Sequence, residues 1–213
     1  MPDSRTSLAD RILDTAMELA RKSSWERLYL HQVAESLGIS LVDLHRHFVV
    51  KDDLVEAWYD RADRAMLHAA DAAGFSSLSV RERLHRLVMT WLDFLAMQRT
   101  VSRDMLLYKL EPAHIHLQLQ GLLRVSRTVQ WLREAARLDS SHLRRIAEEI
   151  GLTAIFLSTF THWMFDSSEN QAQTRDFLDQ RLAQAERLLA AGFGDTTAGS
   201  GAPPAAGPAP PQV

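Results

Sequence analysis

Two histidines, His114 and His116, form an H-x-H pair whose imidazole nitrogens could bind zinc. Residues two apart on a helix do not share a face, so the two rings would point in different directions. The nearest carboxylate, Glu111, is separated from the pair by Pro112, which interrupts a continuous helix. The chain has no cysteine, so thiolates could not complete a zinc site. We therefore expect no metal site and no cofactor.

The sequence lacks the common catalytic motifs. The signatures G-x-S-x-G for a serine nucleophile, G-x-x-x-x-G-K-[ST] for phosphate binding and H-E-x-x-H for a metalloprotease are all absent. The serine pairs at 76–77 and 140–141 are typical of helix breaks and caps. Because no nucleophile is paired with a base, we predict that the protein is not an enzyme.

Large apolar and amphipathic side chains are abundant after residue 90, and they could line a ligand pocket. The candidates are Trp91, Phe94, Met105, Tyr108, His114, Leu117, Trp131, Phe156, Phe160 and Trp163. Ligand sites in helical bundles lie between helices and are mostly apolar with a few polar groups, which Tyr108 and His114 could supply. Each residue taken alone is better explained as ordinary core, because aromatic residues at helical spacing are core by default. Together they predict a pocket for a small apolar ligand.

The composition is that of a globular protein, with 46% hydrophobic and 24% charged residues in a chain of 213. No apolar run approaches the roughly 18 residues that a membrane span needs, and the first residues, MPDSRTSLADRILD, are polar, unlike a signal peptide. We therefore expect a cytoplasmic protein without a membrane span. The net charge is −3, so any nucleic-acid binding must come from a local surface.

Apolar residues recur at helical spacing along most of the chain, which predicts an all-α fold. A first helix is expected over 7–22 and a short one over 30–37, ending at Gly38, the residue that most easily adopts a left-handed conformation. Ser40 is a good N-cap for a helix over 41–47. Two short helices joined by a glycine turn are typical of a helix-turn-helix.

Longer helices are expected after this motif. They are predicted from residue 51 onward and over 80–98, 102–110, 113–138, 141–166 and 171–191. The last two carry apolar seams, which two subunits need to form a four-helix bundle, so we predict a homodimer through these helices. The Gly, Ala and Pro residues of 192–213 predict a disordered tail.

The stretch VAESLGISLVDLHRHFVVKDDLVEAW, residues 33–58, resembles the DNA-binding signature of TetR-family transcriptional regulators. The matching residues are Gly38, Ile39, Ser40, Leu44, His47, Phe48, Lys51 and Leu54. The resemblance implies a TetR-like fold with an N-terminal three-helix module that contains the helix-turn-helix and a C-terminal helical bundle for ligand binding and dimerisation. The implied divisions are a DNA-binding domain over 1–65 with its motif at 29–48, a ligand-binding and dimerisation domain over 66–191, and the tail.

The resemblance also implies which residues contact DNA. The full set is Ser40, Leu41, Val42, Asp43, His45, Arg46, His47 and Lys51. Carried over by position, residues 41–43 face base edges, His45 and His47 approach the backbone, and Lys51 neutralises a phosphate. The implied partners are double-stranded DNA with a palindromic operator and a small apolar or lipid-like effector. The implied function is that of a dimeric repressor that its ligand releases or modulates.

Several residues depart from this pattern. His45 stands where the family usually has tyrosine, and residues 41–43 include no long hydrogen-bond donor. Residues 1–65 carry nine basic and twelve acidic side chains, which is unfavourable for binding a polyanion. The alternative is that His47, Phe48 and Lys51 only cap and pack the junction between two helices.

A second resemblance covers residues 154–182, AIFLSTFTHWMFDSSENQAQTRDFLDQRL. This segment is similar to the end of the lipid-binding accessory proteins of ubiquinone biosynthesis, which share the TetR fold. The matching residues are Ile155, Phe156, Ser158, Thr159, Asp166, Ser168, Thr174, Phe177, Leu178 and Arg181. The alternative function is therefore an isoprenoid-binding accessory protein with a vestigial helix-turn-helix. The acidic N-terminal module favours this alternative, whereas the intact L-x-x-H-F-x-x-K pattern favours the regulator.

Overall fold

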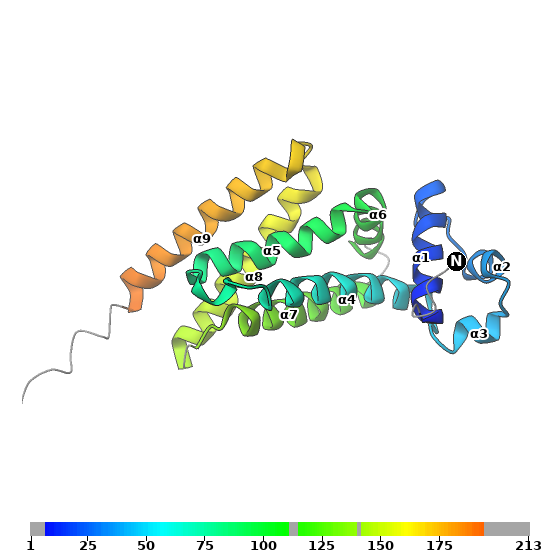
Figure 1. Cartoon of the computed structure of the whole chain (residues 1–213), viewed down its shortest axis with the longest axis horizontal. Coiled ribbons are helices and arrows are strands. Elements are labelled where there is room, and N and C mark those ends of the chain that lie inside the picture. The colour runs from blue at the N-terminus through cyan, green and yellow to red at the C-terminus, as the bar shows by residue number, and fades with distance from the viewer. Residues whose placement is uncertain (1–6, 111–114, 140–141, 194–213) are drawn as a thin grey trace, which may run out of the picture.

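The structure, a computed structural model, describes residues 7–110, 115–139 and 142–193, and this part of the chain is helical without strands. The expected all-α class is confirmed. At one end of the molecule lie α1 (Leu8–Lys22), α2 (Leu30–Leu37) and α3 (Leu41–His45). From this end, α4 (Lys51–Ala70) runs along the molecule into a helical bundle (Figure 1).

Local sequence signals account for the helix-turn-helix. The side chain of Ser7 caps α1 by accepting a hydrogen bond from the amide of Asp10. Gly38 ends α2 in the left-handed conformation with φ of 65°, as predicted. Ser40 caps α3 by accepting from the amide of Asp43, also as predicted. α3 is two residues shorter than expected, because Arg46 is already its C-cap.

The bundle begins after a turn at Gly74, where the backbone has φ of 79°. It contains η1 (Phe75–Ser77), α5 (Val80–Ala96), α6 (Arg99–Leu110), α7 (Ile115–Ala136), α8 (His142–Phe165), η2 (Glu169–Gln171) and α9 (Ala172–Phe193). α5 packs on α4 and α9, α7 packs on α4 and α8, and α9 covers α8. Among the described residues, no helix is both long and apolar enough to cross a membrane.

α4 joins the two ends without a break. It runs through residue 65, where the sequence suggested a domain boundary, and its buried side belongs to the same apolar core as α1 and α5. Arg61 on α4 forms ion pairs with Asp10 and Asp14 on α1. The division at residue 65 therefore stays a proposal. The predicted tail lies outside the described residues, except for 192 and 193, which belong to α9.

A buried ionic cluster fixes α4 against α7. Arg124 is 7% exposed, and its Nη2 lies 2.7 Å from Oδ2 of Asp63, which is 6% exposed. The same guanidinium also contacts Asp60. Asp63 accepts two further hydrogen bonds, from the indole of Trp91 at 2.8 Å and the hydroxyl of Thr128 at 3.1 Å. Burial raises the pKa of Asp63, while Arg124 and these hydrogen bonds oppose the rise. The cluster thus connects α4, α5 and α7.

A second buried acid, Asp166, organises the connection between α8 and α9. Its carboxylate accepts hydrogen bonds from both the amide and the hydroxyl of Ser168, and from both the amide and the hydroxyl of Thr174. Arg99 donates to the backbone carbonyls of Trp163 and Asp166 at the end of α8. Burial alone would raise the pKa of Asp166, but the hydrogen bonds lower it well below its ordinary value.

The substitution Arg124→Met tests the buried cluster. It is expected to lower the free energy of unfolding by about 3–5 kcal/mol, because Asp63 would stay buried without its partner. The control is Arg127→Met, since Arg127 pairs with Glu56 and Asp60 from a half-exposed position, and we expect a loss below about 1 kcal/mol. Urea unfolding measures both. Equal losses in the two variants would contradict the role of the buried cluster.

The substitution Asp166→Asn tests the α8–α9 connection. A carboxyl whose pKa is lower in the folded state than in the unfolded state stabilises the fold above about pH 4, and this contribution disappears as the pH falls through the folded pKa. At pH 7 the variant is expected to lose about 1–3 kcal/mol, and its difference from the wild type should shrink below pH 4. Thermal unfolding at pH 7, 5 and 3 measures this. Asp71→Asn, at an exposed acid, is the control, and an Asp166→Asn effect independent of pH would refute the assignment.

Candidate nucleic-acid interface and ligand pocket

The short helix α3 presents a mixed surface to solvent. Leu44 is buried and attaches α3 to the core, so the side chains on its other sides face outward. Leu41 is 54% exposed and Val42 is 63% exposed. Of the predicted DNA-contacting residues, Ser40, Leu41, Val42, His45, Arg46 and His47 are exposed, and Asp43 is half-buried. The structure therefore brings these seven residues onto one protruding segment.

The charges on this segment are linked to one another. The hydroxyl of Ser40 donates to the Asp43 carboxylate at 2.6 Å, and Nη1 of Arg46 lies 2.9 Å from the same carboxylate. The hydrogen bond from Ser40 lowers the pKa of Asp43, so the acid stays ionised at neutral pH. Arg46 is nevertheless largely exposed, and an exposed ion pair of this kind is weak. Its guanidinium can therefore exchange Asp43 for another anion.

Lys51 occupies a different environment from the one that the sequence suggested. Its Nζ donates to the backbone carbonyl of Trp25 at 2.6 Å and to that of Glu26 at 3.1 Å. It also lies 5.1 Å from the centre of the Trp25 ring. Burial lowers its pKa. In this arrangement Lys51 ties the start of α4 to the connection between α1 and α2, and its predicted phosphate contact stays a prediction.

One residue that supports this surface was missed by the sequence interpretation. The carboxylate of Asp53 accepts from the amides of Val49 and Val50, at 2.7 and 2.9 Å. These bonds fix the turn between α3 and α4, and buried Phe48 anchors the same turn. An acidic residue at the third position of a helix is a known capping signal, so Asp53 could have been identified from its position alone.

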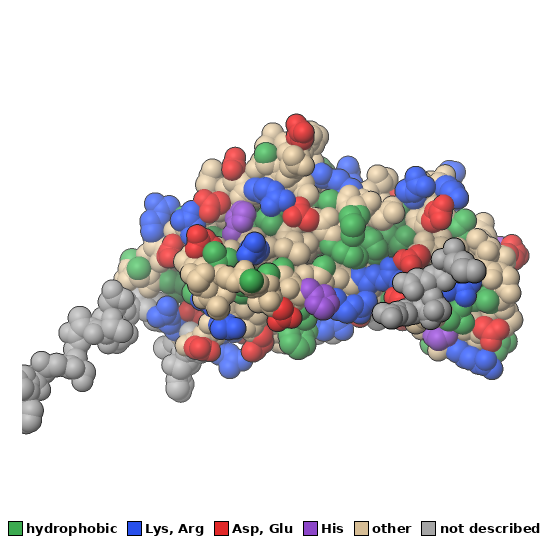
Figure 2. Space-filling model, in the orientation of Figure 1, with side chains coloured by type: hydrophobic (Ala, Val, Ile, Leu, Met, Phe, Trp, Pro, Cys, Tyr) green, Lys and Arg blue, Asp and Glu red, His purple; other side chains and the backbone are tan. Residues whose placement is uncertain are grey.

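No overall excess of positive charge marks the interface. On the face shown in Figure 2, basic and acidic side chains are interspersed at both ends of the molecule. This agrees with the net negative charge of residues 1–65. Near α3, the exposed groups that could attract phosphates are His45, Arg46 and His47.

Most of the predicted pocket residues that can be described meet in one aromatic cluster. The ring of Trp91 lies 5.1 Å from that of Phe156 and 5.5 Å from that of Phe160, which lies 5.7 Å from that of Trp163. Phe94 packs against Trp58 nearby, and Met105 is fully buried. Trp131 is separate, with 46% of its surface exposed. The side chains of Tyr108, His114 and Leu117 lie outside the described residues.

Polar atoms are buried beside this cluster. The hydroxyls of Tyr59 and Thr159 and the indole nitrogen of Trp163 have no hydrogen-bond partner within the described part of the chain. Tyr59 stacks on Trp91 at 5.8 Å, and Thr159 lies between Phe156 and Trp163 at helical spacing on α8. A buried donor without an acceptor costs about 1–3 kcal/mol. These three atoms could therefore bind acceptor atoms of a ligand.

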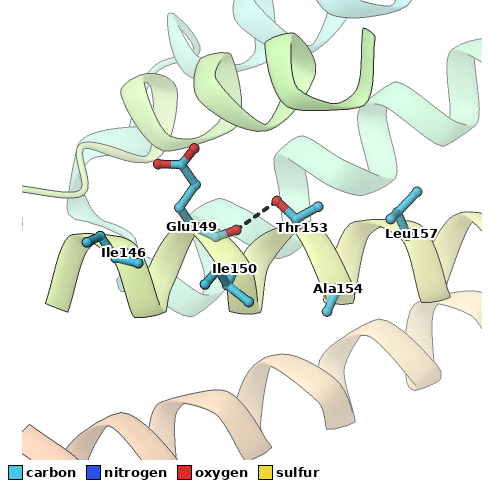
Figure 3. A pocket seen from close by; sticks show the side chains of 6 residues that line it. All are labelled: Ile146, Glu149, Ile150, Thr153, Ala154 and Leu157. Carbon is cyan, nitrogen blue, oxygen red and sulfur yellow. Dashed lines mark hydrogen bonds between the residues drawn. The ribbon is translucent and has the colours of Figure 1, made fainter. Parts of the chain in front are cut away.

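An open groove of about 550 Å³ lies elsewhere, on the outer side of α8 (Figure 3). It is lined by Ile146, Glu149, Ile150, Thr153, Ala154 and Leu157. Ile150 is 66% exposed, and Ile146 and Leu157 are exposed as well. None of the predicted pocket residues lines this groove. It is an exposed apolar face of one helix rather than an enclosed ligand site.

Within the described residues, no group of three or more histidine or acidic side chains is placed to hold a metal ion. His114, which with His116 formed the metal candidate of the sequence, is not among the described residues, and the side chain of His116 is not described either. The expectation that no metal binds stays a prediction.

Similarity to known proteins is found along most of the chain. A TetR transcriptional regulator from Nitrosomonas europaea ATCC 19718 is 48% identical, with a TM-score of 0.76, over 84% of this chain and 98% of that chain. A TetR transcriptional regulator from Rhodococcus sp. RHA1 is 18% identical, with a TM-score of 0.64, over 82% of this chain and 93% of that chain. The TetR family transcriptional regulator PfmR from Thermus thermophilus is 19% identical, with a TM-score of 0.51, over 82% and 98%. The last two show the shared fold.

The C-terminal part of the chain is also similar to a second family. The COQ9 family model matches residues 144–189, which agrees with the resemblance predicted for the C-terminal segment. This range contains Asp166, Ser168 and Thr174, whose contacts with one another form the α8–α9 connection. No curated protein matches the chain. Given the identity and coverage of the Nitrosomonas europaea relative, the chain belongs to the TetR family of transcriptional regulators.

Proposed function

We propose that this regulator is a homodimeric repressor that binds a palindromic DNA operator through α3 and responds to a small apolar ligand in the bundle. The observation that carries the proposal is the exposed α3 segment, held by a glycine turn and a serine cap in a chain that is 48% identical to a TetR transcriptional regulator. In a helix-turn-helix, the second helix enters the major groove. Leu41, Val42 and Asp43 would then face base edges, and His45, Arg46 and His47 would face phosphates.

The exposed apolar face of α8 supports the dimer. Ile146, Ile150 and Leu157 follow one another along this helix, and Leu188 is exposed on α9. Two copies of α8 and α9 related by a two-fold axis would bury these side chains in a four-helix bundle. A two-fold axis would also place two α3 helices in successive major grooves of a palindrome.

The aromatic cluster supports a ligand site. Its rings offer apolar contacts, and the unpartnered hydroxyls of Tyr59 and Thr159 offer hydrogen bonds. Trp91 belongs to this cluster and also donates to Asp63 on α4. A ligand that moves these rings apart would therefore also displace α4, the helix that follows α3. It changes DNA affinity only if it binds the two arrangements of α4 with different affinity.

A lipid-binding accessory protein remains the second candidate, because the COQ9 family model matches most of α8 and most of α9. The acidic N-terminal module also favours it. Selection of random duplexes at near-physiological salt separates the two. The regulator is expected to enrich one palindromic sequence, whereas an accessory protein would enrich none.

The dimer and its role in DNA binding are tested by Ile150→Glu. A buried, unpaired carboxylate at the centre of the interface should dissociate the dimer and lower operator affinity at least tenfold. Light scattering after gel filtration measures the mass, and fluorescence anisotropy measures the affinity. Met97→Glu, at an exposed apolar residue after α5, is the matched control and should change neither. A dimeric Ile150→Glu protein would exclude this face as the interface.

The roles of Lys51 and Arg46 are tested by replacing each with methionine. Lys51→Met is expected to lower the free energy of unfolding by about 1–3 kcal/mol, because two backbone carbonyls lose a charged donor, and to leave the salt dependence of binding unchanged. Arg46→Met should leave stability unchanged and reduce the slope of log K against log[salt] by about 0.9, the value for one phosphate contact. A reduced slope of log K against log[salt] in Lys51→Met would instead support the phosphate contact that the sequence resemblance implied.

A further inference from the structure

The hydrogen-bonding groups of α3 are largely occupied by one another. Ser40 donates to Asp43, and Arg46 pairs with the same carboxylate. Of the three residues proposed to face base edges, Asp43 is held by these contacts, and the other two are Leu41 and Val42, which are exposed on the first turn of the helix. Neither can form a hydrogen bond. Recognition through the usual donors, a bidentate arginine or an amide side chain, is therefore not available at these two positions.

An exposed leucine and valine side by side are chemically matched to one feature of the major groove. Thymine is the one base whose major-groove edge carries an apolar group, its 5-methyl group. The polar residues next to this apolar pair are suited to phosphates, since His45, Arg46 and His47 are all exposed on the same segment. An apolar centre flanked by phosphate-binding groups fits DNA better than it fits an apolar protein surface.

We propose that Leu41 and Val42 determine operator specificity by contacting the 5-methyl groups of thymines in each half-site. This inference rests on the proposed DNA-binding function and specifies its partner as an operator with thymine at the positions that α3 faces. Asp43 contributes by exclusion, because its ionised carboxylate disfavours the acceptor-rich edge of guanine beside it. Arg46 contributes to affinity through a phosphate and not through a base.

Replacing thymine with deoxyuridine tests this directly, because it removes the methyl group and keeps every hydrogen bond. The operator enriched from random duplexes is synthesised with deoxyuridine at each thymine of a half-site in turn. Burying one methyl group favours binding by about fourfold. We expect a loss of about fourfold at one or two thymines per half-site, and about fifteenfold when the symmetric positions of both half-sites are changed together.

The substitutions Leu41→Ala and Val42→Ala assign the loss to these side chains. Each is expected to weaken binding to the thymine operator and to abolish the effect of deoxyuridine at one position. Val42→Thr keeps a methyl group at the same place and should keep the effect. Val49→Ala is the matched control, because Val49 is 62% exposed but lies beyond α3. All of these substitutions are at the surface, and circular dichroism tests whether each variant is folded.

The outcomes separate this inference from the proposed function. If no duplex is enriched, DNA binding itself fails, and the inference fails with it. If a duplex is enriched but deoxyuridine has no effect at any position, DNA binding stands and the inference is overturned. Loss of affinity on replacing guanine by 7-deazaguanine, relieved in Arg46→Met, would likewise overturn it and assign base recognition to Arg46.

Discussion

The position of the helix-turn-helix end depends on a charge that cannot be left unpaired. Arg124 on α7 is buried against Asp63 on α4, and burying either ion alone costs several kcal/mol. The ion pair, with the bonds that Asp63 accepts from Trp91 and Thr128, holds α4 against α5 and α7. Because α4 begins directly after the turn that follows α3, the position of α4 on the bundle also determines the position of α3.

The helix-turn-helix end is held by a different kind of interaction. α3 has only five residues, too few to be stable as an isolated helix, so it depends on its surroundings. Leu44 and Phe48 anchor it to the core, Asp53 fixes the turn that follows, and Lys51 binds the carbonyls of the preceding connection. Some of the residues that match the DNA-binding signature therefore hold α3 in place, and others form its exposed surface.

Features encoded within a few residues could be predicted from the sequence, and features that depend on distant residues could not. The glycine at 38 and the serine at 40 determine the turn through their own conformational and capping preferences, and both were identified correctly. The partner of Asp63 is Arg124, which lies 61 residues away, and no local sequence pattern predicts this pair. Lys51 matched a phosphate-binding position by spacing, but its direction is set by the fold of the α1–α2 connection. Trp131 was grouped with the pocket by residue type, although the orientation of α7 leaves it exposed.

α4 is one unbroken helix, so a small tilt around a point within it displaces its first residue. Asp63 lies twelve residues from Lys51 along this helix, about 18 Å at 1.5 Å per residue. Tilting α4 by about 5° around the ion pair would move its first residue by roughly 1.5 Å, and opposite tilts in two subunits would change the distance between their α3 helices by roughly 3 Å. One base-pair step of DNA is about 3.4 Å. In the proposed dimer, such a tilt would shift the two α3 helices relative to the half-sites of a palindrome.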